Sequence, residues 1–487
     1  MNKLKKTASI NLIISYSAIF IGFFNTIYRT QLLSTEQIGL IAIIFSISGI
    51  LMFFVQSAFT NVIIKYVGRF KHIAKKKGLI IFIFIVSLSL FILVTILFFL
   101  FKTVILKQYD NYLLDKYINF IIFLLFVQSF FNLIDVSLRS FFYPNFPTFL
   151  KYTVQRILHT ILLFTALFGN LSFHLYFILL MVIYAINLVL IFFYFLKIVG
   201  FQSPDFSFLN IKFLKEMFTY GIFMSFGNFV NIFANRIDKI MLGIYTGLSL
   251  TGVYAIGILF GNILGRIGEA VIKIYHPKVS KDLSRGLHSA VAKDYKEVGK
   301  FQVFLGMFLF TFFTFFSEKI LFLLDEKYAQ GFWVVIIMAF GQLINNATSI
   351  CGGIISYSRY YRFDFIIKFV MLIMNVVLNI ILIPKYELIG AVIATSSALI
   401  FYNVCKLIFV YWKFRIQPFS KAILKIIVAN FIIALAFYVM TNYYLPSNLI
   451  YISLIGLISF IIYNFLLYSL SFFTVDEINI IKKRFVK

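Results

Sequence analysis

Long apolar segments alternate with short polar segments along the whole chain. The apolar segments run for about 17 to 25 residues, which lets each one, as a helix, cross a hydrocarbon core about 30 Å thick. The pattern therefore predicts an all-α membrane protein with about fourteen transmembrane helices. The expected spans begin near residues 10, 37, 78, 117, 152, 173, 217, 251, 300, 331, 363, 387, 422 and 447.

The composition leaves no room for a separate soluble domain. The chain of 487 residues is 62% hydrophobic and 13% charged, whereas in soluble domains roughly half of the residues are apolar and a quarter are charged. The longest polar segment, Lys273 to Lys300, is shorter than a domain of about 50 residues. Met1 to Lys6 has the charge of a signal-peptide start, but the apolar run continues past Phe20 without a small-residue cleavage site. We therefore expect a retained first helix.

The two cysteines, Cys351 and Cys405, both fall inside apolar segments. This placement offers neither a disulfide framework nor a cysteine-rich metal site, and it favours a packing role for both. We expect no metal and no cofactor.

Positive charge alternates from loop to loop. If the N-terminus is cytoplasmic, the cytoplasmic segments hold 35 of the 44 Lys and Arg residues and the opposite side holds nine. This asymmetry follows the positive-inside rule, and it predicts cytoplasmic N- and C-termini. It also accounts for the net charge of +26 without nucleic acid as a partner, because the basic residues do not form one polar face.

Three helix starts look alike, each with a polar turn before a Gly and an apolar helix. They are Ser34 to Ile47 (STEQIGLIAIIFSI), Ser249 to Gly261 (SLTGVYAIGILFG) and Tyr386 to Ser397 (YELIGAVIATSS). The first two open spans two and eight, which predicts a duplicated six-helix unit of the kind found in transporters. The expected parts are an N-terminal lobe at 1–216, a C-terminal lobe at 217–420, and spans thirteen and fourteen with a cytoplasmic tail at 421–487. The alternative is that Gly after a polar turn is ordinary helix-start chemistry.

Several polar residues lie near the ends of spans one and seven. Arg29 follows the first apolar run, and Arg236, Asp238 and Lys239 follow the seventh. Before them stand asparagines spaced three and four apart, which share one helical face: Asn228, Asn231 and Asn235. One interpretation is a cationic cavity wall between the two lobes, because polar faces in membranes line interiors or water. The other is snorkelling to the outer interface with an Arg236–Asp238 pair.

Other polar residues carry weaker signals. Arg266 and Glu269, one turn apart, are either an intrahelical pair or the inner mouth of the same cavity. Asp135 and Arg139 are spaced for a structural pair. His159 is interpreted as a packed, hydrogen-bonded residue and not as a proton carrier.

Four segments carry a resemblance to a known family. They are Gln31 to Ile47 (QLLSTEQIGLIAIIFSI), Arg236 to Ile256 (RIDKIMLGIYTGLSLTGVYAI), Leu324 to Val335 (LDEKYAQGFWVV) and Asn379 to Thr395 (NIILIPKYELIGAVIAT). Their order and spacing resemble the polysaccharide-biosynthesis flippases, often called Wzx-type. That family belongs to the superfamily of multidrug, oligosaccharidyl-lipid and polysaccharide exporters.

The resemblance implies two six-helix lobes around a cavity that opens alternately to the two faces of a bacterial cytoplasmic membrane. The implied cargo is an oligosaccharide repeat unit linked by pyrophosphate to a polyprenyl lipid, moved from the inner to the outer leaflet for O-antigen or capsule export. A polysaccharide polymerase is the implied protein partner. Arginine suits such a headgroup because its planar fork binds phosphate oxygens and keeps its charge.

On the family pattern, Arg29 and Arg236 are the expected headgroup contacts, with Lys239 and Arg266 as lesser candidates and Asp238 orienting a neighbouring base. The carboxylate cluster used for ion coupling in drug exporters of this superfamily is not apparent in the sequence.

Two alternatives stay open. A multidrug exporter of the same fold should favour cationic cargo and an acidic cavity, against which the basic residues argue. An integral-membrane sugar polymerase or glycosyltransferase should carry carboxylate-rich or His-rich outer loops. The longest outer loop, Lys102 to Lys116, offers only Asp110 and Asp115.

Overall fold

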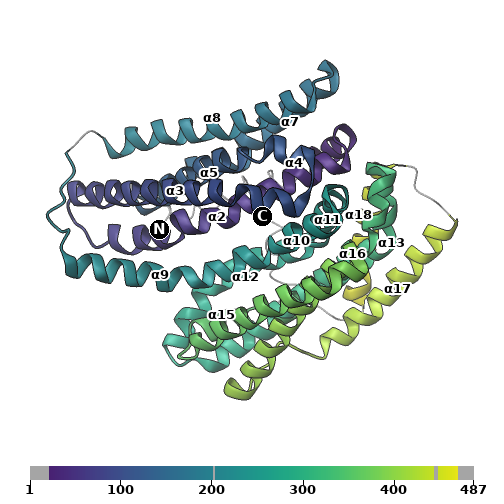
Figure 1. The fold of residues 1–487 in the computed structure, drawn as a ribbon. Helices are drawn as coiled ribbons and strands as arrows, with labels where there is room; N and C mark the ends of the chain where they lie inside the picture. The colour runs from purple at the N-terminus through teal and green to yellow at the C-terminus, as the bar shows by residue number, and fades with distance from the viewer. Residues whose placement is uncertain (1–20, 201–202, 444–447, 470–487) are drawn as a thin grey trace. The chain divides into compact units, whose positions relative to one another are not determined.

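The computed structural model describes residues 21–200, 203–443 and 448–469, and in these ranges all regular structure is helical (Figure 1). The chain divides into two compact units, Met1–Gly252 and Val253–Lys487. The all-α fold class is confirmed. The lobe boundary expected after residue 216 stays a prediction based on the repeat.

Unit 1 begins in the described chain with a helix at residues 21–32. It continues with α2 (Thr35–Val67), α3 (Ile73–Tyr109), α4 (Tyr112–Tyr117), α5 (Phe120–Ser140), α6 (Asn145–Phe149), the π-helix η1 (Leu150–Val154), α7 (Gln155–Gly169), α8 (Phe173–Val199), α9 (Ile211–Ala234), α10 (Ile237–Thr246) and the first residues of α11 (Leu248–Gly261).

Unit 2 follows from within α11. It contains α12 (Ile263–Ser284), α13 (His288–Leu324), the 3₁₀ helix η2 (Glu326–Gly331), α14 (Phe332–Thr348), α15 (Cys351–Ser356), α16 (Tyr361–Phe414), α17 (Ala422–Tyr443) and α18 (Leu449–Ser469).

Helix α2 organises the core of unit 1. Its start is fixed by a capping box, in which the Ser34 hydroxyl accepts from the Gln37 backbone while the Gln37 side chain accepts from the Ser34 backbone. Along its length α2 packs against α3, α5 and α9. The shared core contains Val62, Ile63, Tyr66, Leu79, Ile83, Leu133 and Met217.

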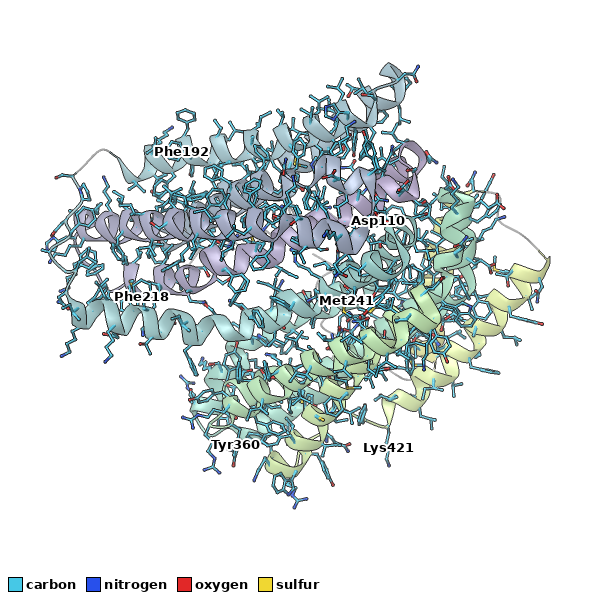
Figure 2. All side chains as sticks on the ribbon, viewed as in Figure 1. Asp110, Phe192, Phe218, Met241, Tyr360 and Lys421 are labelled. Atoms are coloured by element: carbon cyan, nitrogen blue, oxygen red, sulfur yellow. The ribbon has the colours of Figure 1, made fainter. Side chains whose placement is uncertain are left out.

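Many large apolar side chains remain exposed on the surface of the helices. Phe192 on α8 is one of them (Figure 2). Leu100 on α3 is another, with 67% of its surface exposed. Aqueous solvent would penalise so much apolar surface, whereas lipid chains solvate it. The pattern is that of a multi-pass membrane protein.

The span count of fourteen is not confirmed. In the described residues, ten helices are long and apolar enough to cross a membrane, or eleven if the bent pair α11 and α12 forms one span. The expected first span lies partly outside the described residues. Helix α16 counts once, although it breaks at Glu387, whose φ of 48° lies in the left-handed region. Its 54 residues would extend about 80 Å as one straight helix, far more than one crossing needs.

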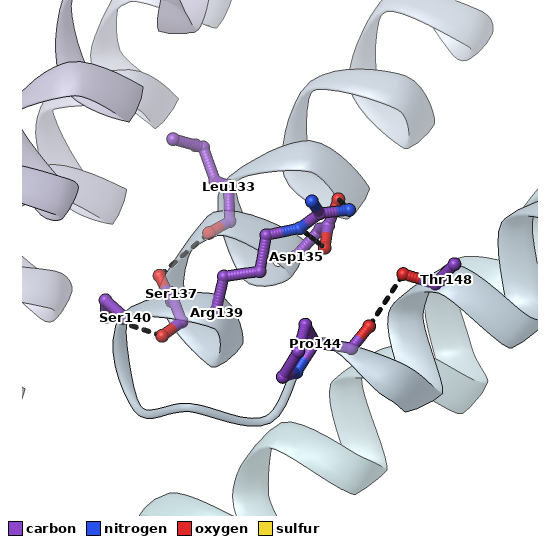
Figure 3. Close-up of polar contacts among 7 residues, drawn as sticks. All are labelled: Leu133, Asp135, Ser137, Arg139, Ser140, Pro144 and Thr148. Atoms are coloured by element: carbon purple, nitrogen blue, oxygen red, sulfur yellow. Dashed lines mark hydrogen bonds and ion pairs between the residues drawn. The ribbon is translucent and has the colours of Figure 1, made fainter. Parts of the chain in front are cut away.

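The expected Asp135–Arg139 pair is present at the end of α5. Arg139 Nε donates to Asp135 Oδ1 at 2.6 Å and Nη2 to Oδ2 at 3.1 Å (Figure 3). Beyond it, Thr148 donates to the carbonyl of Pro144 and stabilises the start of α6. The pair therefore has a local structural role at the turn between α5 and α6.

Candidate substrate-binding site

Arg29 lies in a polar group inside unit 1. The residue is half-buried on the helix at 21–32. Its charge acts electrostatically on His159 of α7 and on Tyr176 and Tyr184 of α8. In the described part of the chain the buried Nε of Arg29 has no hydrogen-bond partner. An unsatisfied guanidinium N–H inside a protein is costly, so this group is a ready donor for an anionic ligand.

Side-chain contacts hold α7 against the helix of Arg29. Asn25 Nδ2 donates to the carbonyl of Arg156 at 3.0 Å, and Thr160 donates to Asn25 Oδ1 at 2.7 Å. If Gly22 carried a side chain, its Cβ would lie 2.0 Å from Arg156 Nη1. Only glycine at this position leaves room for the guanidinium group. A second arginine therefore lies beside the helix that carries Arg29.

His159 completes this polar group. Its ring centroid lies 5.7 Å from that of Tyr184. The expectation of a hydrogen-bonded packing residue is met only in part, because its buried Nε2 has no partner among the described residues. The π-helix η1 directly precedes α7, and such segments often mark functional sites. We call Arg29, Arg156, His159, Tyr176 and Tyr184 the Arg29 cluster.

Arg236 stands at the break between α9 and α10. It is the N-cap of α10, and its φ of −132° interrupts the helical path. Its guanidinium crosses to α2 and donates to the carbonyl of Phe45. A Cβ at Gly49 would lie 2.1 Å from the guanidinium carbon, so Gly49 creates the space for Arg236.

Phe45 connects Arg236 with the Arg29 cluster. The ring of Phe45 lies 5.4 Å from that of Tyr184, which in turn feels the charge of Arg29. Both arginines named from the sequence thus belong to one neighbourhood of unit 1, which the Phe45–Tyr184 pair connects.

The residues that follow Arg236 are held locally. Asp238 is buried in the first turn of α10, where a carboxylate complements the helix dipole, and its Oδ1 accepts from the Lys239 backbone at 2.8 Å. Lys239 Nζ donates to the carbonyl of Asn235 at 3.1 Å. A binding role for these two residues stays a prediction.

Arg266 belongs to unit 2. It is exposed on α12, and so is Glu269 one turn further on. Within the described residues the two side chains form no ion pair, so the intrahelical pair is not observed. A role for Arg266 in binding stays a prediction.

The asparagine face predicted on span seven is exposed on unit 1. Asn228, Asn231 and Asn235 are all exposed, and Asn235 Nδ2 donates to the Asn231 carbonyl at 2.7 Å. Amides facing lipid would lose their hydrogen bonds to water. This face therefore requires a wet or protein-covered environment.

Two of the three similar helix starts contact each other reciprocally. A Cβ at Gly39 would lie 1.8 Å from the carbonyl oxygen of Leu248, four residues before Gly252. A Cβ at Gly252 would lie 1.9 Å from the carbonyl oxygen of Thr35, four residues before Gly39. Such an exchange of equivalent contacts is the mark of a two-fold relation. We call this contact the glycine seam.

The third helix start behaves differently. Gly390 packs against the carbonyl of Leu382 in its own helix, beside the break at Glu387. Its sequence similarity to the other two starts therefore reflects ordinary helix-start chemistry, in which a Gly follows a polar turn, and not a contact with another helix start.

Sequence reasoning missed part of the Arg29 cluster. Arg156 and His159 share one stretch of α7, and the sequence singled out only His159, as a packing residue. Their approach to Arg29 depends on packing between segments more than a hundred residues apart. The cluster around Asp364 in unit 2 was also missed. Its carboxylate accepts from Lys368 Nζ at 2.5 Å, from Ser356 at 3.1 Å and from Tyr402 at 2.8 Å.

The described residues offer no metal site. In that part of the chain no group of three or more His, Cys, Asp or Glu side chains is placed to hold a metal ion. The two arginines of the Arg29 cluster carry donors only, which suits an anion and not a cation.

Comparison with known proteins connects the chain to sugar-polymer synthesis. A family model described as "Polysaccharide biosynthesis protein" matches residues 4–265. The capsular polysaccharide biosynthesis protein CapF of Staphylococcus aureus is 24% identical over 188 residues, which cover 38% of this chain and 48% of CapF. An uncharacterized membrane protein of Methanocaldococcus jannaschii, MJ1068, is 24% identical over 212 residues, which cover 43% of this chain and 40% of that protein. The matches thus span less than half of each relative.

Solved structures share the fold over most of the chain. The lipid II flippase MurJ in an inward closed conformation superposes with a TM-score of 0.75 at 17% identity, over 94% of this chain and 98% of that one. An inward-facing multidrug resistance transporter of the MATE family superposes with a TM-score of 0.66 at 12% identity, over 84% of this chain and 98% of that one. At these identities the likeness concerns the fold.

Proposed function

Since the chain belongs to the polysaccharide biosynthesis family, a flippase family of the multidrug, oligosaccharidyl-lipid and polysaccharide exporter superfamily, we propose that it moves a polyprenyl-pyrophosphate-linked oligosaccharide across the membrane. The observation that carries the proposal is the Arg29 cluster. A buried arginine donor without an acceptor, Arg29 Nε, lies in the same neighbourhood as the Phe45–Tyr184 pair, and Arg236 donates to the Phe45 carbonyl. The pyrophosphate supplies the missing acceptor oxygens.

The chemistry of the cargo explains why such a cluster is needed. A pyrophosphate cannot enter hydrocarbon alone, because burying an unpaired charge is very costly. Guanidinium groups replace its water with bidentate hydrogen bonds and stay charged in a low-dielectric environment. Tyr176 and Tyr184 add hydroxyl groups that donate to further oxygens.

The exposed asparagine face of α9 supports a hydrated route for the sugars. Sugar hydroxyls exchange hydrogen bonds with amides as readily as with water, so Asn228, Asn231 and Asn235 offer them a polar surface within a membrane span. In this proposal the sugars pass along this face while the lipid chain stays in the bilayer.

The glycine seam supports alternating access. In this proposal the contact between the starts of α2 and α11 is part of a barrier at one membrane face, which separates when the transporter changes its open side. In this proposal the cargo enters from the inner leaflet of a bacterial cytoplasmic membrane and leaves to the outer leaflet. The termini are cytoplasmic, and a polysaccharide polymerase receives the cargo.

A transporter fits the polar groups of the described chain better than an enzyme does. The Arg29 cluster holds donors and one imidazole without a carboxylate beside it to act as a paired acid or base. A multidrug exporter with cationic cargo is disfavoured for the same reason, because Arg29 and Arg156 would repel a cation.

Reconstitution tests the proposal. The purified full-length protein is placed in sealed vesicles that carry a fluorescent polyprenyl-pyrophosphate oligosaccharide, and a membrane-impermeant reagent reports which leaflet the sugar occupies. We expect movement between leaflets at a rate well above that of protein-free vesicles. If the lipid-linked sugar does not move and the same vesicles take up a cationic dye, the proposed flippase function would be wrong and a drug exporter would be favoured.

A further inference from the structure

The start of α9 carries an open hollow with a volume of about 540 Å³. Its lining residues follow one face of the helix: Lys212, Lys215, Glu216, Thr219, Tyr220 and Phe223. The opposite face of α9 packs on α2, where Phe218 places its ring 6.0 Å from that of Phe59 (Figure 2). The hollow is bordered by the end of α2, which Glu216 and Tyr220 contact, while Lys212 and Lys215 are exposed.

The hollow has an excess of positive charge. Its one carboxylate, Glu216, already accepts from Arg69 at 3.1 Å and from the Tyr66 hydroxyl at 2.9 Å. Lys212 and Lys215 are exposed, and within the described residues neither has an ion-pair or hydrogen-bond partner. Both ammonium groups therefore remain for a ligand.

The other end of the hollow is aromatic. The ring of Tyr220 is fixed by Lys65, whose Nζ lies 3.6 Å from the ring centroid. Phe223 is 63% exposed, and Ile222 beside it is 52% exposed. From Lys212 to Phe223 the helix rises about 16 Å, roughly half of the hydrocarbon core. One face thus changes from cationic to apolar over the depth of one leaflet.

We propose that this hollow is the loading site of the flippase, where the pyrophosphate of the lipid-linked sugar rests on Lys212 and Lys215 and its polyprenyl chain follows Tyr220 and Phe223. The inference rests on the proposed function and adds a place of first contact, separate from the Arg29 cluster. The lysines stand one turn apart, so their charges reach two adjacent phosphates together. A phospholipid with a single phosphate uses only one of them.

The position of the hollow fits a first contact and not a final one. Lysine is a mobile, strongly hydrated cation that attracts phosphate without enclosing it. The arginines of the cluster are half-buried and offer forked, directional donors. Passage from lysine to arginine therefore leads the headgroup from a loose contact to a tighter one.

A binding experiment on the full-length protein in detergent tests the inference apart from transport. The probe is a fluorescent polyprenyl pyrophosphate, with inorganic pyrophosphate and phosphatidylglycerol as competitors. Each basic residue at a membrane surface strengthens the binding of an anionic lipid about fivefold. Lys212→Ala combined with Lys215→Ala should therefore weaken binding of the probe on the order of tenfold or more. Lys212→Arg with Lys215→Arg should keep most of the affinity, and Lys197→Ala, an exposed lysine at the end of α8, is the matched control.

A second variant separates the lipid from its headgroup. Phe223→Ser should weaken binding of the polyprenyl pyrophosphate severalfold and leave competition by inorganic pyrophosphate unchanged. The inference is overturned if the double lysine variant binds like the Lys197→Ala control, or if phosphatidylglycerol competes as well as the pyrophosphate lipid. In both cases the wild-type protein would still transport the lipid in vesicles. These results would therefore contradict the loading site without contradicting the proposed flippase function.

Discussion

The two units each bury a polar cluster, and the clusters differ in how well they are satisfied. In unit 2, Asp364 receives hydrogen bonds from Lys368, Ser356 and Tyr402. Lys406, only 5% exposed, lies with its Nζ 4.1 Å from the centroid of the Tyr402 ring. Every member of this group contacts another, so the cluster is a closed network.

The Arg29 cluster of unit 1 is open by comparison. Arg29 Nε and His159 Nε2 are buried without partners in the described chain, although tyrosines and a second arginine surround them. A satisfied network stabilises a fold, whereas a buried polar atom without a partner carries a free-energy cost that a bound ligand can remove. The contrast favours a structural role for the Asp364 cluster and supports the binding role that we propose for the Arg29 cluster.

The largest expected effect on stability comes from breaking the closed network. Asp364→Ala leaves Lys368 without its ion-pair partner and Tyr402 without its acceptor, and removing one partner of a buried charged pair costs about 3–5 kcal/mol. Thermal unfolding of the purified protein in detergent should show a clear fall in midpoint. Glu297→Ala is the control, because its 3.9 Å contact with Lys293 is exposed and should matter little. An unchanged midpoint for Asp364→Ala would remove the structural role.

Breaking the open cluster should affect transport and not folding. Arg29→Ala removes a donor whose Nε has no partner, so the unfolding midpoint should stay close to that of the wild type. Loss of a hydrogen bond between a charged group and the pyrophosphate, about 1.5–3 kcal/mol, should slow transport in vesicles roughly tenfold to a hundredfold. Arg29→Lys should recover part of the rate. Unfolding of Arg29→Ala as severe as that of Asp364→Ala would erase the distinction between the clusters.

The smallest effect is expected at the Asp135–Arg139 pair. The pair is local to α5, and the Arg139 side chain is 46% exposed, so Asp135→Asn should cost under about 1 kcal/mol. Transport by this variant should match the wild type. A stable Asp135→Asn protein that fails to transport would place the pair in the transport machinery and widen the candidate site.

Helix content was predictable from the sequence because it depends on local pattern. Apolar runs long enough for a bilayer mark the spans, and the STEQ segment at Ser34 has the residues of the capping box that starts α2. The similar segments around Gly39 and Gly252 predicted a duplicated unit, which stays a prediction, and the structure brings these two glycines into reciprocal contact.

The composition of the site was only partly predictable, because it depends on packing between distant helices. Arg29 and Arg236 stood out as charges after apolar runs. Nothing in the local pattern shows that Phe45 and Gly49 receive the Arg236 side chain, since this follows from how α10 crosses α2. His159 looked like a packing residue because its missing partner is visible only once its neighbours are known.

The central claim is that guanidinium groups inside unit 1 carry the diphosphate, and the rate of leaflet exchange in sealed vesicles tests it most directly. The protein to compare with the wild type combines Arg29→Gln and Arg236→Gln, which remove both charges and keep hydrogen-bonding side chains. The account predicts that this variant stays folded, with no more than the modest loss in unfolding midpoint expected from the Arg236–Phe45 hydrogen bond, and moves the polyprenyl-pyrophosphate oligosaccharide no faster than protein-free vesicles. Exchange at the wild-type rate by the same variant would contradict it.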